Sequence, residues 1–108
     1  MTAIARIWIT ALYDQDDSHS IAAEATNMAR AEEHLDAAGV AYSRQRLQNG
    51  TVDLSFDVSL DDAIDVLRGL RSAGVSYGTI DIEGTSESDP RIDALESFDP
   101  QVIISVEV

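Results

Sequence analysis

The sequence of 108 residues contains no cysteine, no lysine and only two histidines. Without cysteine the chain can form no disulfide, thiolate metal site or cysteine nucleophile. Without lysine, all seven basic residues are arginine; against twenty acidic residues they leave a net charge of −13. A surface this negative repels DNA, RNA and anionic membranes through its long-range field. The composition therefore argues against a protein that binds nucleic acid or membranes directly.

Long apolar runs are also missing. The opening residues Met1–Arg6 lack the basic region and apolar stretch of a signal peptide, and no segment approaches the length of a membrane span. We therefore expect a cytoplasmic protein. The length predicts one domain over residues 1–108, large enough to bury a core without stabilising disulfides or metal ions.

Three explanations of the acidity are open. High salt in a cell screens the self-repulsion of a charged chain, and an aspartate-rich, lysine-free composition resembles that of halophilic proteins. A GC-rich genome also favours Ala, Arg, Asp and Gly. The third explanation is functional: the acidic surface docks a basic protein, or imitates a phosphate backbone and so blocks a nucleic-acid-binding site.

One sequence motif occurs twice, over residues 35–42 and 70–77, with Leu, Ala, Gly, Val and Tyr at the same positions of both copies. Gly39 and Gly74 suit the left-handed position that ends many helices, because glycine has no Cβ. Val40 and Val75 follow at the offset that packs back on the last apolar turn of the helix. The repeat predicts two similar helix-to-strand corners, and so a fold of two related halves.

Hydrophobic periodicity predicts the elements between these corners. We expect strands over residues 3–13, 41–48, 51–58 and 77–83, and helices over 20–38 and 60–73, the second capped by Ser59. Asp89-Pro90 predicts the start of a short helix over 90–97, with Ile92 and Leu95 buried, and residues 102–108 form a fifth strand. That strand either extends the sheet or joins a partner subunit.

This order of elements resembles the ferredoxin-like α+β sandwich over residues 3–83. The resemblance implies two helices on one face of an antiparallel sheet ordered 4-1-3-2, with residues 84–108 as a C-terminal extension. Because this fold carries many unrelated functions, it does not decide the function.

The sheet face without helices is the most informative surface. Asn49-Gly50 predicts a two-residue turn, which pairs Arg46 with Asp53, Arg44 with Ser55 and Tyr42 with Asp57. Strand alternation then gathers an interaction face consisting of Trp8, Tyr42, Tyr77, Arg6, Arg44, Arg46, Asp53 and Asp57. Trp, Tyr and Arg carry much of the binding energy at protein interfaces, which favours an interface, most simply a homodimer. The alternative is an ordinary open sheet face.

Other chemistry finds little support. RNA-binding relatives of this fold carry aromatics on the central strands, whereas the third strand here offers Asp53, Ser55 and Asp57. His19 beside Asp16 and Asp17 has the composition of a polar loop as much as of a metal site, and His34 is expected on a helix surface. Neither a phosphate-cradling motif nor a nucleophile triad is present, and we expect no cofactor and no metal.

The leading hypothesis is a non-enzymatic binding module, in its sharpest form an inhibitor or nucleic-acid mimic acting on a basic protein. One alternative is a regulatory or enzymatic small-molecule site between the sheets of a dimer. The other is a halophile domain whose acidity is salt adaptation only. The sequence favours a non-enzymatic role without excluding an enzyme.

Overall fold

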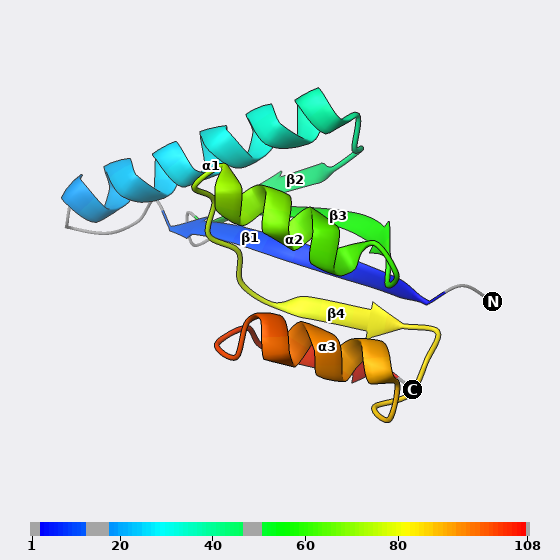
Figure 1. The fold of residues 1–108 in the computed structure, drawn as a ribbon. Helices are drawn as coiled ribbons and strands as arrows, with labels where there is room; N and C mark the ends of the chain where they lie inside the picture. The colour runs from blue at the N-terminus through cyan, green and yellow to red at the C-terminus, as the bar shows by residue number, and fades with distance from the viewer. Residues whose placement is uncertain (1–2, 13–17, 47–50, 108) are drawn as a thin grey trace.

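The computed structural model describes residues 3–12, 18–46 and 51–107 of the protein. The elements within these ranges alternate between strand and helix along the chain (Figure 1). They are β1 (Ile4–Leu12), α1 (Ser18–Ala38), β2 (Ser43–Arg46), β3 (Thr51–Ser59), α2 (Ala63–Ser72), β4 (Ile80–Glu83), α3 (Pro90–Phe98) and β5 (Ile104–Glu107).

The strands form one sheet in the order β2-β3-β1-β4-β5. Neighbouring strands are antiparallel from β2 to β4, whereas β5 lies parallel to β4. The predicted α+β class is confirmed, and the fifth strand extends the sheet beside β4. A parallel neighbour requires a crossover connection, and α3 supplies it.

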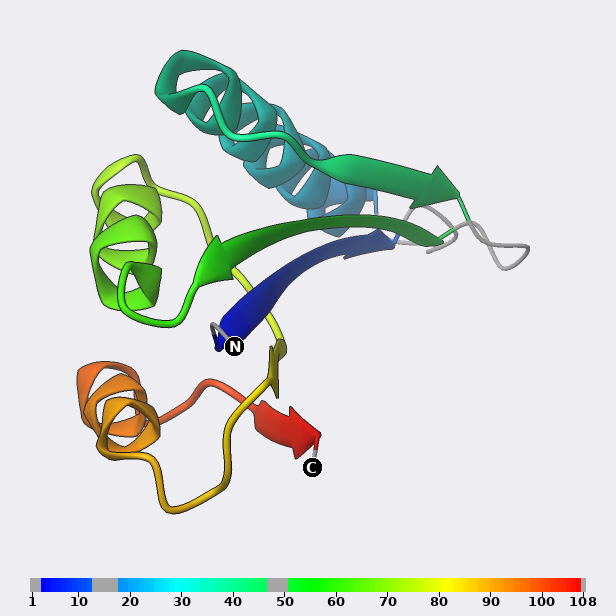
Figure 2. The same ribbon diagram turned by 90° about the vertical axis from the view of Figure 1, so that its right-hand side faces the viewer.

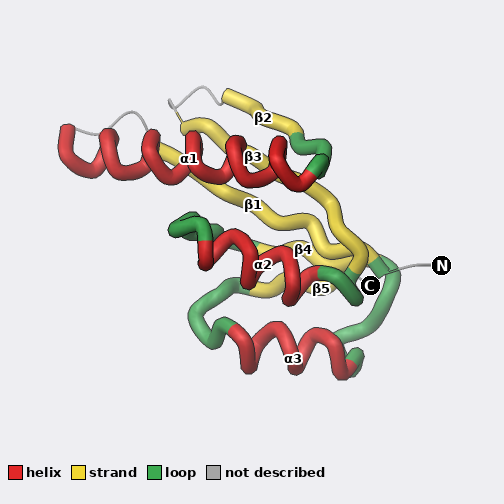
Figure 3. The backbone as a smooth tube through the Cα atoms, turned by 45° about the horizontal axis from the view of Figure 1, so that its top comes forward, coloured by secondary structure: helices red, strands yellow, loops and turns green. Residues whose placement is uncertain are grey.

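The three helices lie on the same side of the sheet, and the other side carries none of the described elements (Figures 2 and 3). Figure 3 shows α1 crossing over β3 and β1, with α2 and α3 side by side beyond it. No helix in the described ranges is both long enough and apolar enough to cross a bilayer.

The core fills the space between sheet and helices. Alternate residues of the strands point into it, and every third or fourth residue of each helix meets them. The buried apolar residues include Ala5, Ile7 and Ile9 of β1, Val52, Leu54 and Phe56 of β3, Ile80 and Ile82 of β4, Met28, Ala31 and Leu35 of α1, Ala63, Leu67 and Leu70 of α2, and Ile92 and Leu95 of α3. The inward faces predicted for these strands are confirmed.

Both helix-to-strand corners have the predicted geometry. Gly39 and Gly74 have φ values of 72° and 79°, in the left-handed region. The Val40 N–H donates to Leu35 O and the Val75 N–H donates to Leu70 O, each at 2.9 Å. These are the bonds of a Schellman closure, which satisfies carbonyls at the helix end.

The later helices differ in how they begin. The predicted capping of the second helix by Ser59 is wrong, because residues 60–62 form a turn and α2 starts at Ala63 with Asp62 as its N-cap. The Asp62 N–H donates to Ser59 Oγ at 3.3 Å within this turn. At α3 the Asp89 carboxylate accepts from the Arg91 N–H at 2.9 Å, with Pro90 in the first turn. The bonds that Asp89 accepts from Arg91 and Thr85 hold its pKa far below the ordinary range.

The hairpin register is one residue away from the prediction. Arg46 lies opposite Val52 and Arg44 opposite Leu54, so Gln45 takes the place opposite Asp53. The expected pairs of Arg46 with Asp53 and of Arg44 with Ser55 are therefore wrong. The Asn49-Gly50 turn from which they were inferred lies outside the described residues.

Candidate functional site

The helix-free side of the sheet carries most of the polar side chains of the strands. We call this surface the acidic face. Strand register places on it Arg6, Trp8 and Thr10 of β1, Asp53, Ser55 and Asp57 of β3, Asp81 and Glu83 of β4 with Thr79 before it, and Ser105 and Glu107 of β5.

The polar groups of β1 are each held by a carboxylate of a neighbouring strand. Arg6 donates twice to Asp57, from Nε to Oδ1 at 2.8 Å and from Nη2 to Oδ2 at 3.2 Å. The Trp8 Nε1–H donates to Asp81 Oδ2 at 2.9 Å, and the Thr10 hydroxyl donates to Asp53 Oδ1 at the same distance. These cross-strand bonds orient the side chains of Arg6, Trp8 and Thr10 on the face.

Negative charge dominates this surface. Its described residues contribute one cation, Arg6, and five carboxylates: Asp53, Asp57, Asp81, Glu83 and Glu107. The hydrogen bond and charge of Asp57 raise the pKa of the Arg6 guanidinium, and Glu83 and Asp81 add to the effect. The face can therefore attract a cationic partner, and four of its carboxylates have no salt bridge to a described arginine.

Trp8 occupies the middle of the acidic face. Its neighbours across the strands are small: Ser55 lies opposite on β3, and the Trp8 N–H donates to Thr79 O on the β4 side. The indole is half-buried, and its N–H is tied to Asp81. A fixed aromatic ring beside carboxylates is a setting in which a guanidinium can stack and pair at once.

Only some of the aromatic and arginine residues that we expected on the acidic face lie there. A one-residue change of register moves a side chain to the opposite face of a strand. Arg44 accordingly lies on the helix side, where its Nη1 donates to Glu32 Oε1 of α1 at 3.1 Å. Tyr42 packs against the core there, and burial, with Asp36 beside it, raises its pKa. Arg46, opposite Val52, is likewise not paired across the sheet with Asp53.

Tyr77 leaves the acidic face because of a bulge. The Gly78 N–H donates to Trp8 O and the Trp8 N–H donates to Thr79 O, so two residues face one. A bulge turns the preceding side chain to the other side of the sheet. Tyr77 packs on the core, and its hydroxyl donates to Asp99 Oδ2 at 2.8 Å. Of the three aromatic residues expected on the face, only Trp8 is there.

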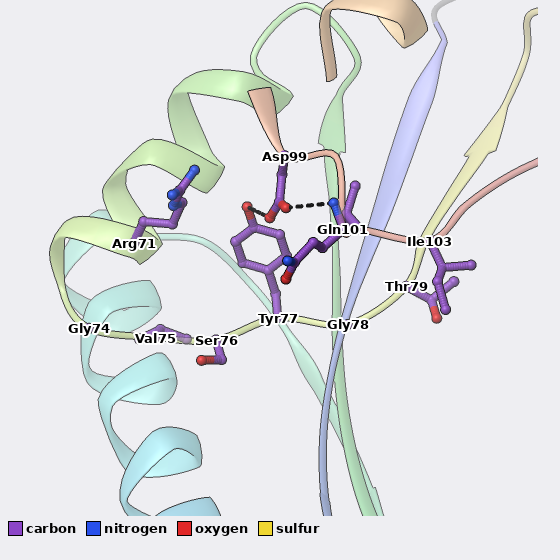
Figure 4. Close-up of a pocket in the computed structure, with 11 residues that line it drawn as sticks. Arg71, Gly74, Val75, Ser76, Tyr77, Gly78, Thr79, Asp99, Gln101 and Ile103 are labelled. Carbon is purple, nitrogen blue, oxygen red and sulfur yellow. Dashed lines mark hydrogen bonds between the residues drawn. The ribbon is translucent and has the colours of Figure 1, made fainter. Parts of the chain in front are cut away.

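Tyr77 lines a groove of about 600 Å³ (Figure 4). Figure 4 shows the Tyr77 ring pointing from the segment that precedes β4 toward Asp99, with Gln101 beside them. Burial and the bond to Asp99 raise the pKa of Tyr77, so the phenol stays protonated well above neutral pH. Asp99 accepts from Tyr77 through one oxygen and from the Gln101 N–H through the other. We interpret the pair as a structural tie between the segment that precedes β4 and the α3–β5 connection.

Metal-binding groups are sparse in the parts of the chain that the structure describes, where no cluster of three or more His, Asp or Glu could hold an ion. The side chains of His19, Asp16 and Asp17 lie outside the described residues. His34 is half-buried rather than on the open surface expected for it. Its imidazole lies against Gly69 of α2, where an added Cβ would stand 3.1 Å from Nε2.

The sequence pattern also places on the acidic face two residues that the predicted interaction face does not include. Asp81 and Glu83 alternate with the buried Ile80 and Ile82, so the same periodicity that gave the core also assigns them to the outer side. Glu107 could not be placed, because the pairing of β5 depends on the crossover through α3.

Fold and face together define an α+β sandwich with an open acidic sheet surface. No protein-family profile and no curated protein sequence matches the chain. Among solved structures, the crystal structure of MupZ from Pseudomonas fluorescens is similar, with a TM-score of 0.58 and 11% sequence identity. The alignment covers 99% of this chain and 86% of that one. At this identity the likeness extends to the fold alone.

Proposed function

We propose that this protein is a non-enzymatic, cytoplasmic binding module that docks a basic protein partner on its acidic face. The observation that carries the proposal is the arrangement of five carboxylates and one arginine around a fixed tryptophan on the uncovered side of the sheet. Complementary charge steers such partners together, and an aromatic centre supplies the apolar contact.

The proposed partner is a different chain. A face-to-face homodimer would bring the carboxylates of two copies together, and like charges across an interface cost several kcal/mol. The homodimer expected from the aromatic content is thus less well supported than a basic partner. In its sharpest form the module competes with nucleic acid for a basic binding surface, as an inhibitor that imitates phosphates.

We also propose that the fold is the ferredoxin-like sandwich, extended at one edge by α3 and β5. The order β2-β3-β1-β4 supports this, since it is 4-1-3-2 counted from the opposite edge. Each half contains one Schellman corner of the same geometry, which supports an origin in two related units.

The test uses an arginine-rich peptide and two double variants of equal net charge. Asp53→Asn with Asp81→Asn removes two charges from the acidic face but keeps oxygen acceptors for Thr10 and Trp8. Asp93→Asn with Glu96→Gln removes two exposed charges from α3. Calorimetric titration at 0.05, 0.15 and 0.5 M salt then compares their affinities.

The face variant should bind at least about tenfold more weakly than the wild type, and the α3 variant within about threefold of it. Binding should persist at 0.15 M salt, where the Debye length is about 8 Å. Equal losses in the two variants, or complete loss of binding at 0.15 M salt, would mean nonspecific attraction to the net charge.

A further inference from the structure

β3 has an open half-edge. β2 pairs only with Val52–Ser55, whereas β3 continues to Ser59. Over residues 56–59, β3 therefore has β1 on one side and no described strand on the other. Figure 3 shows the connection before β2 turning to the end of α1 instead of running along β3.

The backbone of Asp57 faces this opening. Ladder bonds in an antiparallel pair alternate between the two sides of a strand. The Leu60 N–H donates to Ala3 O, so the even-numbered residues of β3 bond to β1 and the odd-numbered ones face the β2 side. Ser55 has Ser43 opposite it, but Asp57 has no strand partner there. Within the part of the chain that the structure describes, the N–H and the C=O of Asp57 therefore have no strand partner on this side and can pair with an incoming strand.

A groove of about 740 Å³ lies at this opening. Its lining is of two kinds. The acidic face contributes Arg6, Ser55 and Asp57, and the helix side contributes Val40, Tyr42 and Val58. A strand laid along the groove would expose alternate side chains to these two surfaces, because successive residues of a strand point to opposite faces.

We propose that the open half-edge of β3 takes up an extended basic segment of the partner as an antiparallel added strand. This rests on the proposed function for the charge of the partner. A cationic residue lies opposite Asp57 and exchanges both backbone bonds with it, its side chain on the acidic face. Its apolar neighbours pack against Val40, Tyr42 and Val58. Main-chain bonds supply affinity and the alternating side chains supply specificity.

The experiment uses eight-residue peptides of alternating arginine and valine. One peptide is unmodified, one is N-methylated at every arginine and one at every valine. In the proposed pairing the arginine amides point at β3 and the valine amides point away. N-methylation of arginine should weaken binding by more than about tenfold, because the methyl group on the arginine opposite Asp57 removes its backbone donor and blocks close approach to β3. N-methylation of valine should change affinity by less than about threefold.

A peptide with its four arginines and four valines in separate blocks is the control for charge. Hydrogen exchange at the Asp57 amide, followed by NMR, gives a second readout, and this amide should become protected only with the alternating peptide. Equal binding of the two N-methylated peptides, or no protection of Asp57, would overturn the added strand while leaving the acidic face intact. Failure of both unmodified peptides to bind would contradict the proposed function itself.

Discussion

At the scale of single residues, the residues around Trp8 make it the aromatic centre of the acidic face. Its indole N–H is held by Asp81, and Ser55 lies opposite it on β3. Tyr77 is aromatic as well, but its hydroxyl is used inside the molecule, on Asp99. Both polar ends are used within the molecule, so the two aromatics differ in the side of the sheet on which the ring lies: Trp8 lies on the uncovered face, whereas Tyr77 packs against the core.

The tie between Tyr77 and Asp99 predicts a pH dependence of stability. The folded state raises the pKa of Tyr77 above its ordinary value of 10. The stabilisation is therefore complete below pH 10 and is lost as the pH rises above 10, because the unfolded phenol ionises first. Tyr77→Phe should cost about 1 kcal/mol near pH 7. Urea unfolding from pH 7 to 11 should show the difference from wild type shrinking above pH 10, and parallel curves would contradict the tie.

At the scale of elements, the two helix-to-strand corners set the architecture. Each glycine turns the chain from a helix on the covered side into the next extended segment, and each following valine closes the helix end. Val75 is buried with the core, so the corner also contributes to packing. The same short sequence motif therefore specifies both where the helix ends and the direction of the next segment.

Substitution at the corners should show this. Gly39→Ala and Gly74→Ala should each lower the free energy of unfolding by about 1 kcal/mol, because alanine is strained at positive φ. Nothing lies within 4 Å of a Cβ at Gly39, so its loss would be conformational alone. Gly78→Ala is the matched control, since a Cβ there meets only Trp8 O at 3.6 Å. If thermal unfolding shows Gly78→Ala to be the most destabilising of the three, the role given to the positive φ of Gly39 and Gly74 is contradicted.

The sequence predicted the elements well and their faces less well. Apolar alternation in β1, β3 and β4 correctly identified the core, because that pattern repeats over many residues. The faces of Tyr42 and Arg44 depended on one turn, and a single-residue shift in the hairpin reversed both. Tyr77 was reversed by the bulge at Gly78. Shifts of one residue leave the hydrophobic period unchanged, so no pattern in the sequence reveals them.

At the scale of the whole molecule, the charge of −13 acts on stability as well as on binding. Self-repulsion opposes the compact state, and salt screens it. The melting temperature should rise between 0.05 and 0.5 M NaCl, most steeply below about 0.15 M, where the Debye length falls to about 8 Å. A chain that folds only in molar salt would support salt adaptation, and a melting temperature independent of salt would contradict the role given to self-repulsion.

Trp8 allows the most direct measurement of whether the acidic face binds a basic partner. It is the only tryptophan, so its indole N–H gives one resonance in a nitrogen-15 spectrum. Titration with an arginine-rich peptide at 0.15 M salt should shift this resonance together with the amides of β1 and β3. Shifts confined to α1 and α3, with the indole signal unmoved, would place binding on the helices and contradict the account.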